Sequence, residues 1–300
     1  MNVIITGAGG MLGRALISNI ARCEASRVYA LTTSIERTRS MLPDDIDVAI
    51  VANSDASWLF RDICPDALIH CAFSRGNDGA SLRYALDFTG EVFSLVSEKC
   101  ATVNVSSQSV YCAARALPAK EAEAPIAPAS SYAIAKFSTE VMLSRFCRSR
   151  LKTNLRLASL LSPSFGDRFV NKMVRAGRED GVVKLAGPND VFGFLSVRDA
   201  ADGIASMLRC LSMQGWETVY NLGPKEMGFS LETIGECVVN RLNLKGHPCR
   251  LDDGVSGGSE KSSALDSGAF QRDFGWSSAF GLAEIIDSII DFQDLAVRND

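Results

Sequence analysis

The sequence contains little that is typical of a metalloprotein, a secreted protein or a membrane protein. Its two histidines, His70 and His247, are too few for a histidine-based metal centre, so we expect no metal site. The nine cysteines are odd in number and no pair is spaced C-x-x-C, so we expect reduced thiols in a cytoplasmic protein. The first apolar run, residues 3–5, is too short for a signal peptide, and no run approaches the ~18 apolar residues of a membrane span.

The chain also lacks an excess of positive charge. It has 31 lysines and arginines against 35 aspartates and glutamates, a formal net charge of −4. Without a broad basic surface, we expect no binding to nucleic acid. Of its 300 residues, 47% are apolar and 22% are charged, which excludes a disordered chain and allows one large domain or two smaller ones.

Short apolar runs alternate with helical patterns through the first half of the chain. The runs do not alternate polar with apolar residues, which is typical of parallel strands covered on both faces. The runs are residues 2–6, 27–32, 48–51, 67–71, 102–106 and 154–159, and the helical patterns are residues 11–22, 82–100 and 132–148. This alternation predicts an α/β fold with a doubly wound parallel sheet, the Rossmann arrangement.

Glycine and proline interrupt the second half more often. Short helices are expected there at residues 169–178, 197–210, 230–242 and 282–295. We predict a dinucleotide-binding domain at residues 1–161 and a smaller mixed substrate lobe at residues 162–300, partly interleaved with the sheet. The pattern G-x-S-x-G at residues 254–258 occurs in hydrolases, but no histidine follows it and its setting is a Gly/Ser-rich loop.

A glycine pattern follows the first predicted strand and begins the first predicted helix. Gly7 allows a tight turn, Gly10 lets the backbone approach a pyrophosphate, and Gly13 lets the helix pack on the strand. The phosphates would bind the free N–H groups at the helix start, around Met11 and Leu12. An ordinary glycine-rich turn can have the same glycine spacing. The predicted strand before it and the predicted helix after it favour dinucleotide binding.

The end of the second predicted strand bears on the choice of cofactor. An acidic residue there would bind the ribose 2′-hydroxyl of NAD, but the chain has Thr33 and Ser34. These hydroxyls and the charge of Arg37 could bind a 2′-phosphate, so we favour NADP over NAD. Arg37 as a solvated helix residue is the alternative. Asn53, just after the third predicted strand, is placed to meet the adenine edge.

Tyr132 and Lys136 are spaced i and i+4, on one face of a predicted helix. A phenol with a pKa of about 10 is a poor acid–base catalyst at neutral pH, and a nearby ammonium lowers that pKa. The spacing alone is common by chance. Ser107, however, ends a predicted strand at the sheet edge where open α/β folds bind ligands, and its hydroxyl could bind a substrate oxygen.

Together these segments resemble the extended short-chain dehydrogenase/reductase family, in its nucleotide-sugar epimerase/dehydratase/reductase branch. The resemblance covers nearly the whole chain. Its motifs are the glycine turn, Ile69-His70-Cys71-Ala72, Ser106-Ser107, Val110-Tyr111, Glu123-x-Pro125-x-x-Pro128, Tyr132 to Glu140, Val197-Arg198-Asp199-Ala200-Ala201, Tyr220-Asn221-Leu222-Gly223 and Phe274-Gly275-Trp276.

The resemblance implies roles for particular residues. Ser107, Tyr132 and Lys136 match the catalytic triad: Tyr132 exchanges a proton with the substrate oxygen, Ser107 hydrogen-bonds that oxygen, and Lys136 tunes Tyr132 and holds the ribose. Expected cofactor contacts are Gly7, Gly10, Met11, Leu12, Gly13, Thr33, Ser34, Arg37, Asn53, Cys71, Ala72, Phe73, Ser106, Tyr132, Lys136 and Leu160. Expected substrate contacts are Ser107, Gln108, Tyr132, Ser162 and Lys172.

Departures from the family pattern narrow the function. Dehydratases of the branch usually carry an acidic pair where this chain has Gln108-Ser109, which disfavours water elimination. At position 192 the family commonly has a basic residue that contacts the nucleotide diphosphate, but this chain has Phe192. The prediction of a nucleotide-linked substrate is therefore weaker than the prediction of the fold. Lys172, Arg175 or Lys184 could supply the missing positive charge. All three are at least as well explained as ordinary surface residues.

We therefore expect an NADPH-dependent ketoreductase of a nucleotide-linked keto-deoxy sugar, acting in carbohydrate biosynthesis. Two alternatives stay open: a nucleotide-sugar 4-epimerase, and a non-catalytic NADP-binding regulator with the same fold. The helices expected around 82–100 and 132–148 have wide apolar faces. In the resembling family such helices form a homodimer interface, and simple burial against the sheet is the other explanation.

Overall fold

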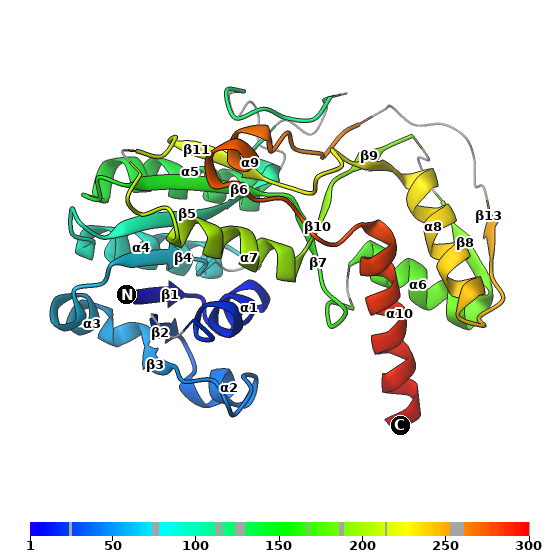
Figure 1. Ribbon diagram of the computed structural model, residues 1–300, viewed down its shortest axis with the longest axis horizontal. Helices are drawn as coiled ribbons and strands as arrows, with labels where there is room; N and C mark the ends of the chain where they lie inside the picture. Colours follow the sequence, from blue (N-terminus) through cyan, green and yellow to red (C-terminus); the bar gives the residue numbers. More distant parts are fainter. Residues whose placement is uncertain are drawn as a thin grey trace.

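The computed structural model contains a large parallel sheet covered by helices, with a smaller lobe beside it (Figure 1). It describes residues 1–23, 26–73, 78–111, 115, 117–123, 130–166, 168–185, 189–213, 215–252 and 261–299. The G-x-S-x-G pattern, Pro125 and Pro128 lie outside these residues. No helix in the described part of the chain is long and apolar enough to cross a membrane.

All seven strands of the main sheet run parallel, which confirms the predicted Rossmann arrangement. In spatial order they are β11 (Val219–Leu222), β6 (Lys152–Leu157), β5 (Ala101–Ser107), β4 (Ala67–His70), β1 (Asn2–Thr6), β2 (Arg27–Thr32) and β3 (Ala49–Ala52). The strand order reverses between β1 and β4, and ligands of such sheets bind at the carboxyl ends of the strands at this point. Those ends face the smaller lobe (Figure 1).

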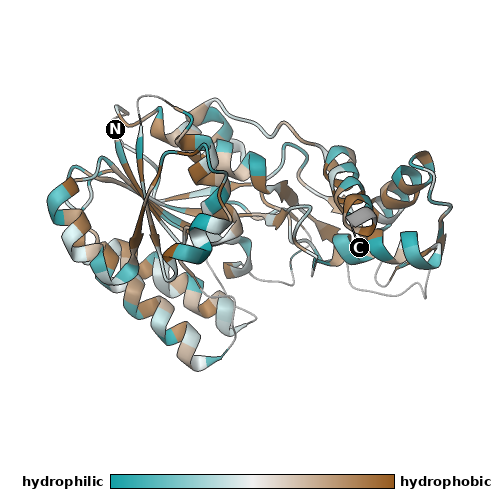
Figure 2. Ribbon diagram, turned by 90° about the horizontal axis from the view of Figure 1, so that it is seen from below, coloured by the Kyte–Doolittle hydropathy of each residue, from teal (hydrophilic) through white to brown (hydrophobic). Residues whose placement is uncertain are grey.

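Helices cover both faces of the sheet, because successive residues of a strand point to opposite sides. In β1, Val3 and Ile5 pack toward α1 (Met11–Ile20) and α7 (Val197–Leu208). Ile4 packs toward the other side, against α3 (Ala56–Ile63) and α4 (Gly79–Leu95), next to α5 (Ser131–Phe146). All three β1 side chains are fully buried, and each such burial contributes about 1.5–3 kcal/mol to folding. Figure 2 shows the apolar strands between helices with hydrophilic outer faces.

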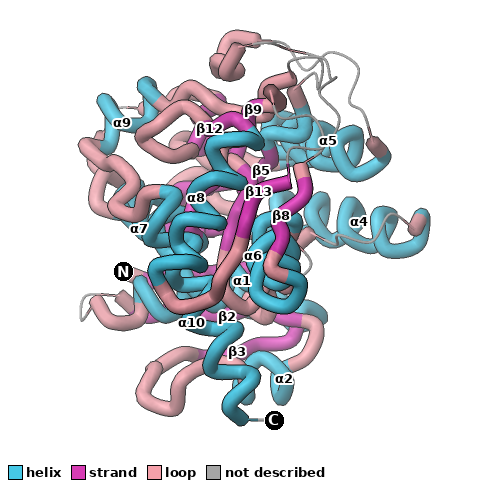
Figure 3. The backbone as a smooth tube through the Cα atoms, turned by 90° about the vertical axis from the view of Figure 1, so that its right-hand side faces the viewer, coloured by secondary structure: helices cyan, strands magenta, loops and turns pink. Residues whose placement is uncertain are grey.

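The smaller lobe, which faces the viewer in Figure 3, has its own apolar core. Its helices are α6 (Phe169–Asp180), α8 (Leu231–Leu244) and α10 (Leu282–Asn299). Short strands pair around them: β7 (Ser159–Leu161) with β10 (Phe194–Ser196), β8 (Val182–Lys184) with β13 (Arg250–Asp252), and β9 (Val191–Phe192) with β12 (Phe229–Ser230). The chain also returns from this half to the main sheet, through α7, β11 and α9 (Gly268–Phe274).

Several predicted element ends were wrong. The helix expected to reach residue 100 ends at Leu95, where Val96 turns to extended backbone although its side chain is fully buried. The first helix ends at Ile20 rather than 22, and the last one continues to Asn299 rather than 295. Two short helices, α2 (Ile35–Ser40) and α3, were not predicted.

Candidate functional site

The glycine turn joins β1 to α1 at the point where the strand order reverses. Gly7 has a φ of +66°, a left-handed conformation that residues with a Cβ rarely adopt. A Cβ on Gly7 would lie 2.7 Å from the Ala72 nitrogen, and one on Gly13 would lie 2.3 Å from the Gly7 carbonyl oxygen. Both glycines are therefore required by close backbone contacts. Gly10 is the N-cap residue of α1, whose first N–H groups have no intrahelical partner.

A buried histidine holds the two strand ends together at this turn. The His70 Nδ1 lies 2.9 Å from the Thr6 hydroxyl, and its Nε2 lies 2.9 Å from the Thr89 hydroxyl. Thr6 also accepts the Ala72 N–H at 3.1 Å, while Thr89 donates to the Ala85 carbonyl at 2.7 Å. Burial, assisted by the charge of Lys136, lowers the pKa of His70 to about 3. His70 is thus a neutral structural residue, which fixes the backbone of Ala72 against Gly7.

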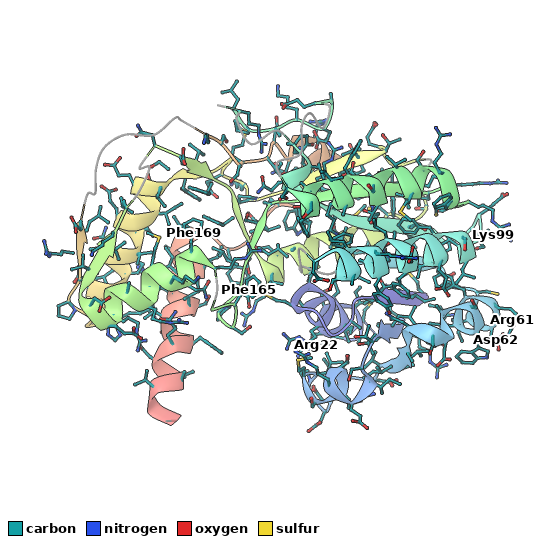
Figure 4. The ribbon with its side chains drawn as sticks, turned by 180° about the vertical axis from the view of Figure 1, so that it is seen from behind. Arg22, Arg61, Asp62, Lys99, Phe165 and Phe169 are labelled. Atoms are coloured by element: carbon teal, nitrogen blue, oxygen red, sulfur yellow. The ribbon has the colours of Figure 1, made fainter. Side chains whose placement is uncertain are left out.

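Two cavities meet at the glycine turn. Their volumes are about 630 Å³ and about 610 Å³, and they share the lining residues Gly7, Gly10 and Phe73. The larger cavity extends along the carboxyl ends of β5 and β6 and the start of β7 toward Phe165, which lies at the junction of sheet and smaller lobe (Figure 4). The smaller cavity extends along the ends of β2 and β3. The exposed pair Arg61 and Asp62 lies at the opposite end of the sheet.

The three predicted catalytic residues line the larger cavity. Ser107 is the last residue of β5, and its hydroxyl is 3.1 Å from that of Ser109. Tyr132 lies in the first turn of α5, where the Ser130 side chain caps the helix by accepting the Ala133 N–H. Lys136 is nearly fully buried, and its ammonium donates to the Val105 carbonyl at 2.7 Å. The cap and this bond place the phenol and the ammonium of one helix beside the end of β5.

Phe73 contacts two of these residues. Its ring centroid lies 4.3 Å from the Lys136 Nζ. The Tyr132 ring meets it edge to face, with centroids 5.7 Å apart and an interplanar angle of 79°. The aromatic ring therefore covers the ammonium on the cavity side of α5.

A buried polar network supports α5 from the sheet side. The Ser106 hydroxyl donates to Glu140 at 2.5 Å, and Glu140 accepts from Arg156 on β6 at 3.0 and 2.7 Å. The Arg156 guanidinium stacks 4.6 Å from the ring centroid of Tyr111, whose hydroxyl donates to Asn221 on β11 at 2.8 Å. Burial alone lowers the pKa of Arg156, and the bonds to Glu140 outweigh it, so the pKa is raised. The network joins three strands to the helix that carries Tyr132 and Lys136.

The smaller cavity has a polar end at the carboxyl edge of β2. Thr33, Ser34 and the exposed Arg37 line it, and no carboxylate is among its described lining residues. Thr32 and Thr38 share a hydrogen bond of 2.8 Å between their hydroxyls in its floor. Asn53 also lines it; within the described structure its buried Oδ1 accepts no hydrogen bond, while its Nδ2 donates to the Tyr84 hydroxyl at 3.4 Å.

The structure brings most of the predicted site residues to one cavity or the other. The larger cavity is lined by Gly7, Gly10, Met11, Leu12, Gly13, Cys71, Phe73, Ser106, Ser107, Gln108, Tyr132, Lys136 and Leu160. The smaller cavity is lined by Gly7, Gly10, Thr33, Ser34, Arg37, Asn53, Ala72 and Phe73. Two predicted substrate contacts lie elsewhere: Ser162 lines a separate cavity of about 270 Å³, and Lys172 is exposed on α6.

Sequence reasoning missed Arg168 and Phe165, which line the larger cavity. The Arg168 guanidinium stacks 4.9 Å from the Phe165 ring centroid. Arg168 is the N-cap residue of α6 and does not cap it with its side chain. Because Ser, Thr, Asp and Asn are usual at that position, an arginine there is a sequence signal for a role other than capping.

The Cys71 thiol, which lines the larger cavity, is in its protonated, unreactive form. Burial raises the pKa of the Cys71 thiol to about 12, although the nearby Lys136 charge lowers it. The cysteines that the structure describes are free thiols. Within the same described residues, no group of three or more His, Cys, Asp or Glu side chains could hold a metal ion.

Comparison with known proteins agrees with the fold. Residues 3–223 match the NAD dependent epimerase/dehydratase family. UDP-N-acetylglucosamine 4-epimerase from Bacillus cereus superposes with a TM-score of 0.76 at 20% identity, covering 100% of this chain and 97% of that chain. Among curated proteins, no relative matches the chain.

Two further solved structures show the same fold. One is UDP-glucuronic acid 4-epimerase from Bacillus cereus in complex with UDP-glucuronic acid and NAD, with a TM-score of 0.77, 19% identity, and coverage of 99% of this chain and 100% of that chain. The other is dTDP-glucose 4,6-dehydratase from Bacillus anthracis in complex with NAD, with a TM-score of 0.77, 16% identity, and coverage of 98% and 97%.

Proposed function

Because the chain belongs to the NAD-dependent epimerase/dehydratase family, we propose that it binds a nicotinamide dinucleotide across the two cavities and reduces the keto group of a nucleotide-linked keto-deoxy sugar. The observation that carries this proposal is the convergence of Ser107, Tyr132 and Lys136 in the cavity that begins at the glycine turn.

The smaller cavity fits the adenosine half of the cofactor. The buried Oδ1 of Asn53, which no described donor reaches, suits the amino group of an adenine. The start of α1 at Gly10 suits the pyrophosphate, since N–H groups and the helix dipole favour an anion there. The larger cavity then remains for the nicotinamide half and the sugar.

NADP is the cofactor that the end of β2 favours. Thr33 and Ser34 offer hydroxyls, and the exposed Arg37 offers a positive charge. An acidic residue there would repel a 2′-phosphate, and the described lining of the cavity holds none. NAD is the alternative, because the two complexes named above contain NAD.

The residues around the larger cavity divide the acid–base work. Tyr132 donates its phenolic proton to the carbonyl oxygen as that oxygen becomes a hydroxyl, and Ser107 hydrogen-bonds the same oxygen. Lys136, whose backbone partner is the Val105 carbonyl, adds a buried positive charge four residues from Tyr132. A bound nicotinamide supplies the hydride, and the chain supplies positioning and proton transfer.

Arg168 supports a nucleotide-linked substrate. It places a positive charge in the larger cavity on the side of the smaller lobe, where a diphosphate could pair with it. Gln108 and Ser109, which line the same cavity, offer neutral side chains in place of the acidic pair of the dehydratases. This lining favours reduction or epimerisation of the sugar over water elimination.

An assay with NADPH and a 4-keto-6-deoxy nucleotide sugar separates the candidate functions. Loss of absorbance at the reduced-nicotinamide band is the result expected for the ketoreductase. Interconversion of sugars without net cofactor consumption would instead identify the 4-epimerase. Binding of the cofactor without turnover of any sugar would instead support the non-catalytic regulator.

The homodimer remains part of the proposal. On α5, Ile134 and Val141 are seven residues apart on one face, and 55% and 46% of their surfaces are exposed. Tyr84 on the adjacent α4 is 53% exposed. We expect this face to pair with a second copy, and light scattering on the purified protein would show a mass of twice 32.3 kDa. Ile134→Glu would shift it to the monomer mass.

A further inference from the structure

Phe73 stands where the two cavities meet. It lines both of them, together with Gly7 and Gly10. A ligand that reaches from one cavity into the other must therefore pass between this side chain and the glycine turn. The inference that follows rests on the proposed function, because it concerns how a dinucleotide enters that passage.

The Phe73 ring covers the group that is expected to hold the nicotinamide ribose. The Lys136 ammonium has three N–H donors, of which one bonds the Val105 carbonyl at 2.7 Å. The ring faces the same ammonium, with its centroid 4.3 Å from Nζ, at a distance typical of a cation–π contact. A ribose hydroxyl on the cavity side would have to replace the ring as a neighbour of the ammonium.

The ring also touches the proton donor. Its edge-to-face contact with Tyr132, at 5.7 Å and 79°, makes the three side chains one cluster. The adjoining backbone is held in place, because Ala72 packs on Gly7 and donates its N–H to Thr6. We take the movement of the ring to be a rotation of the Phe73 side chain, with Ala72 staying in place.

We propose that Phe73 gates the nicotinamide half of the cofactor site. The ring turns away from Lys136 when a dinucleotide binds, and the lost cation–π contact lowers the affinity for the whole cofactor. The adenosine half does not reach Lys136, so it binds without this cost. Phe73 thus sets the affinity for the complete dinucleotide independently of the residues at the end of β2.

Calorimetry with NADPH and with ADP tests the gate. Phe73→Ala should bind NADPH about five- to thirtyfold more tightly than the wild type, because the contact that is lost involves a buried ammonium. ADP affinity should change less, because ADP does not reach Lys136 although Phe73 also lines the smaller cavity. Phe73→Leu keeps an apolar side chain without a π face and should show a smaller gain. Phe73→Trp presents a stronger π face and should weaken NADPH binding. Phe146→Ala, at a residue 51% exposed on α5, is the control and should change neither affinity.

The outcomes distinguish the gate from the proposed function. Weaker NADPH binding by Phe73→Ala, with ADP unchanged, would show that the ring is a contact of the cofactor and would overturn the gate alone. Tighter NADPH binding by Phe73→Trp would overturn it as well, even if Phe73→Ala does not fold. Binding of neither nucleotide by any of these proteins, with the wild type folded by circular dichroism, would overturn the gate and the proposed function together.

Discussion

The carboxylate of Glu140 accepts two hydrogen bonds from the guanidinium of Arg156, and the two side chains are only 5% and 4% exposed. Glu140 lies one helical turn beyond Lys136, and Arg156 lies on the strand next to β5. The pair therefore links α5, which carries Tyr132 and Lys136, to β6, the neighbour of the strand that ends at Ser107. Ser106 adds a third bond to the same carboxylate.

Glu140→Gln should lower the free energy of unfolding by about 3–5 kcal/mol, because it leaves Arg156 as a buried cation without its counter-charge. Unfolding by guanidinium chloride, followed by circular dichroism, measures this change in free energy. Glu98→Gln is the matched control: it breaks an ion pair with Arg150 whose side chains are 56% and 82% exposed, and it should cost less than about 1 kcal/mol. Equal losses from the two variants would refute the importance of the buried pair.

Gly13→Ala should abolish dinucleotide binding and destabilise the protein, because the new Cβ would lie 2.3 Å from the Gly7 carbonyl oxygen. Gly79→Ala is the comparison. Gly79 is the first residue of α4 with open space around it, so alanine there should be neutral or stabilise by up to about 1 kcal/mol. Thermal unfolding and NADPH titration of the two variants check this, and a Gly13→Ala protein with normal NADPH affinity would contradict it.

The buried His70 should make stability fall as the pH is lowered. Its pKa is about 3 in the folded protein against 6.5 when exposed, so between these values the unfolded chain binds more protons. The contribution of His70 is complete above pH 6.5 and declines by up to about 1.4 kcal/mol per pH unit as the pH falls toward 3. Urea denaturation from pH 7 to 4 should show a steeper loss for the wild type than for His70→Asn. Parallel curves would mean that His70 becomes protonated in the folded protein as readily as in the unfolded chain.

The main sheet was predictable because each of its early strands is a short buried apolar run. Residues 2–6 and 27–32 were placed at their observed bounds. The periodicity could not tell where a helix stops if the next segment is also buried: Val96 and Cys100 are fully buried in the connection after α4, so the pattern continued past Leu95. The six residues of α2 are too few, and too polar, to show a helical period.

The two halves of the site were predictable from the glycine turn and from the Tyr132–Lys136 spacing. The site residues from the smaller lobe were harder to predict, because the path of the chain after Ser162 depends on tertiary packing. The hydroxyl of Ser162 lies 3.3 Å from that of Ser164 rather than in the larger cavity, and Lys172 lies on the exposed side of α6. Arg168, four residues before Lys172, lines the cavity, whereas the charge had been expected from Lys172, Arg175 or Lys184.

Arg37→Ala should raise the Kd for NADPH about tenfold and leave that for NADH within about twofold, because one charge-assisted contact to a 2′-phosphate is lost. The matched control is Arg39→Ala. The Arg39 guanidinium donates to the Val48 carbonyl at 3.0 Å, and Arg39 is not among the described residues that line the cavity. Fluorescence titration with both cofactors decides the point. An equal effect on NADPH and NADH would show that Arg37 does not read the 2′-phosphate and would favour NAD.

Tyr132→Phe should lower the rate of sugar turnover by about 10²–10⁴-fold, because the phenolic proton is removed and the ring is kept. Its contact with Phe73 is between rings, so the affinity for NADPH should stay nearly unchanged. Stopped-flow absorbance gives the rate, and calorimetry gives the affinity. A variant that turns over sugar at the wild-type rate would remove Tyr132 from proton transfer.

The most direct measurement follows one deuterium atom. NADPH that carries deuterium at the transferred position of its nicotinamide is mixed with the wild type and a 4-keto-6-deoxy nucleotide sugar, and the sugar is analysed by mass spectrometry. A product heavier by one deuterium at the former keto carbon, formed by the wild type and not by Tyr132→Phe, is the predicted result. A sugar product without deuterium, or no product while the cofactor is bound, would contradict the reduction proposed for this cleft.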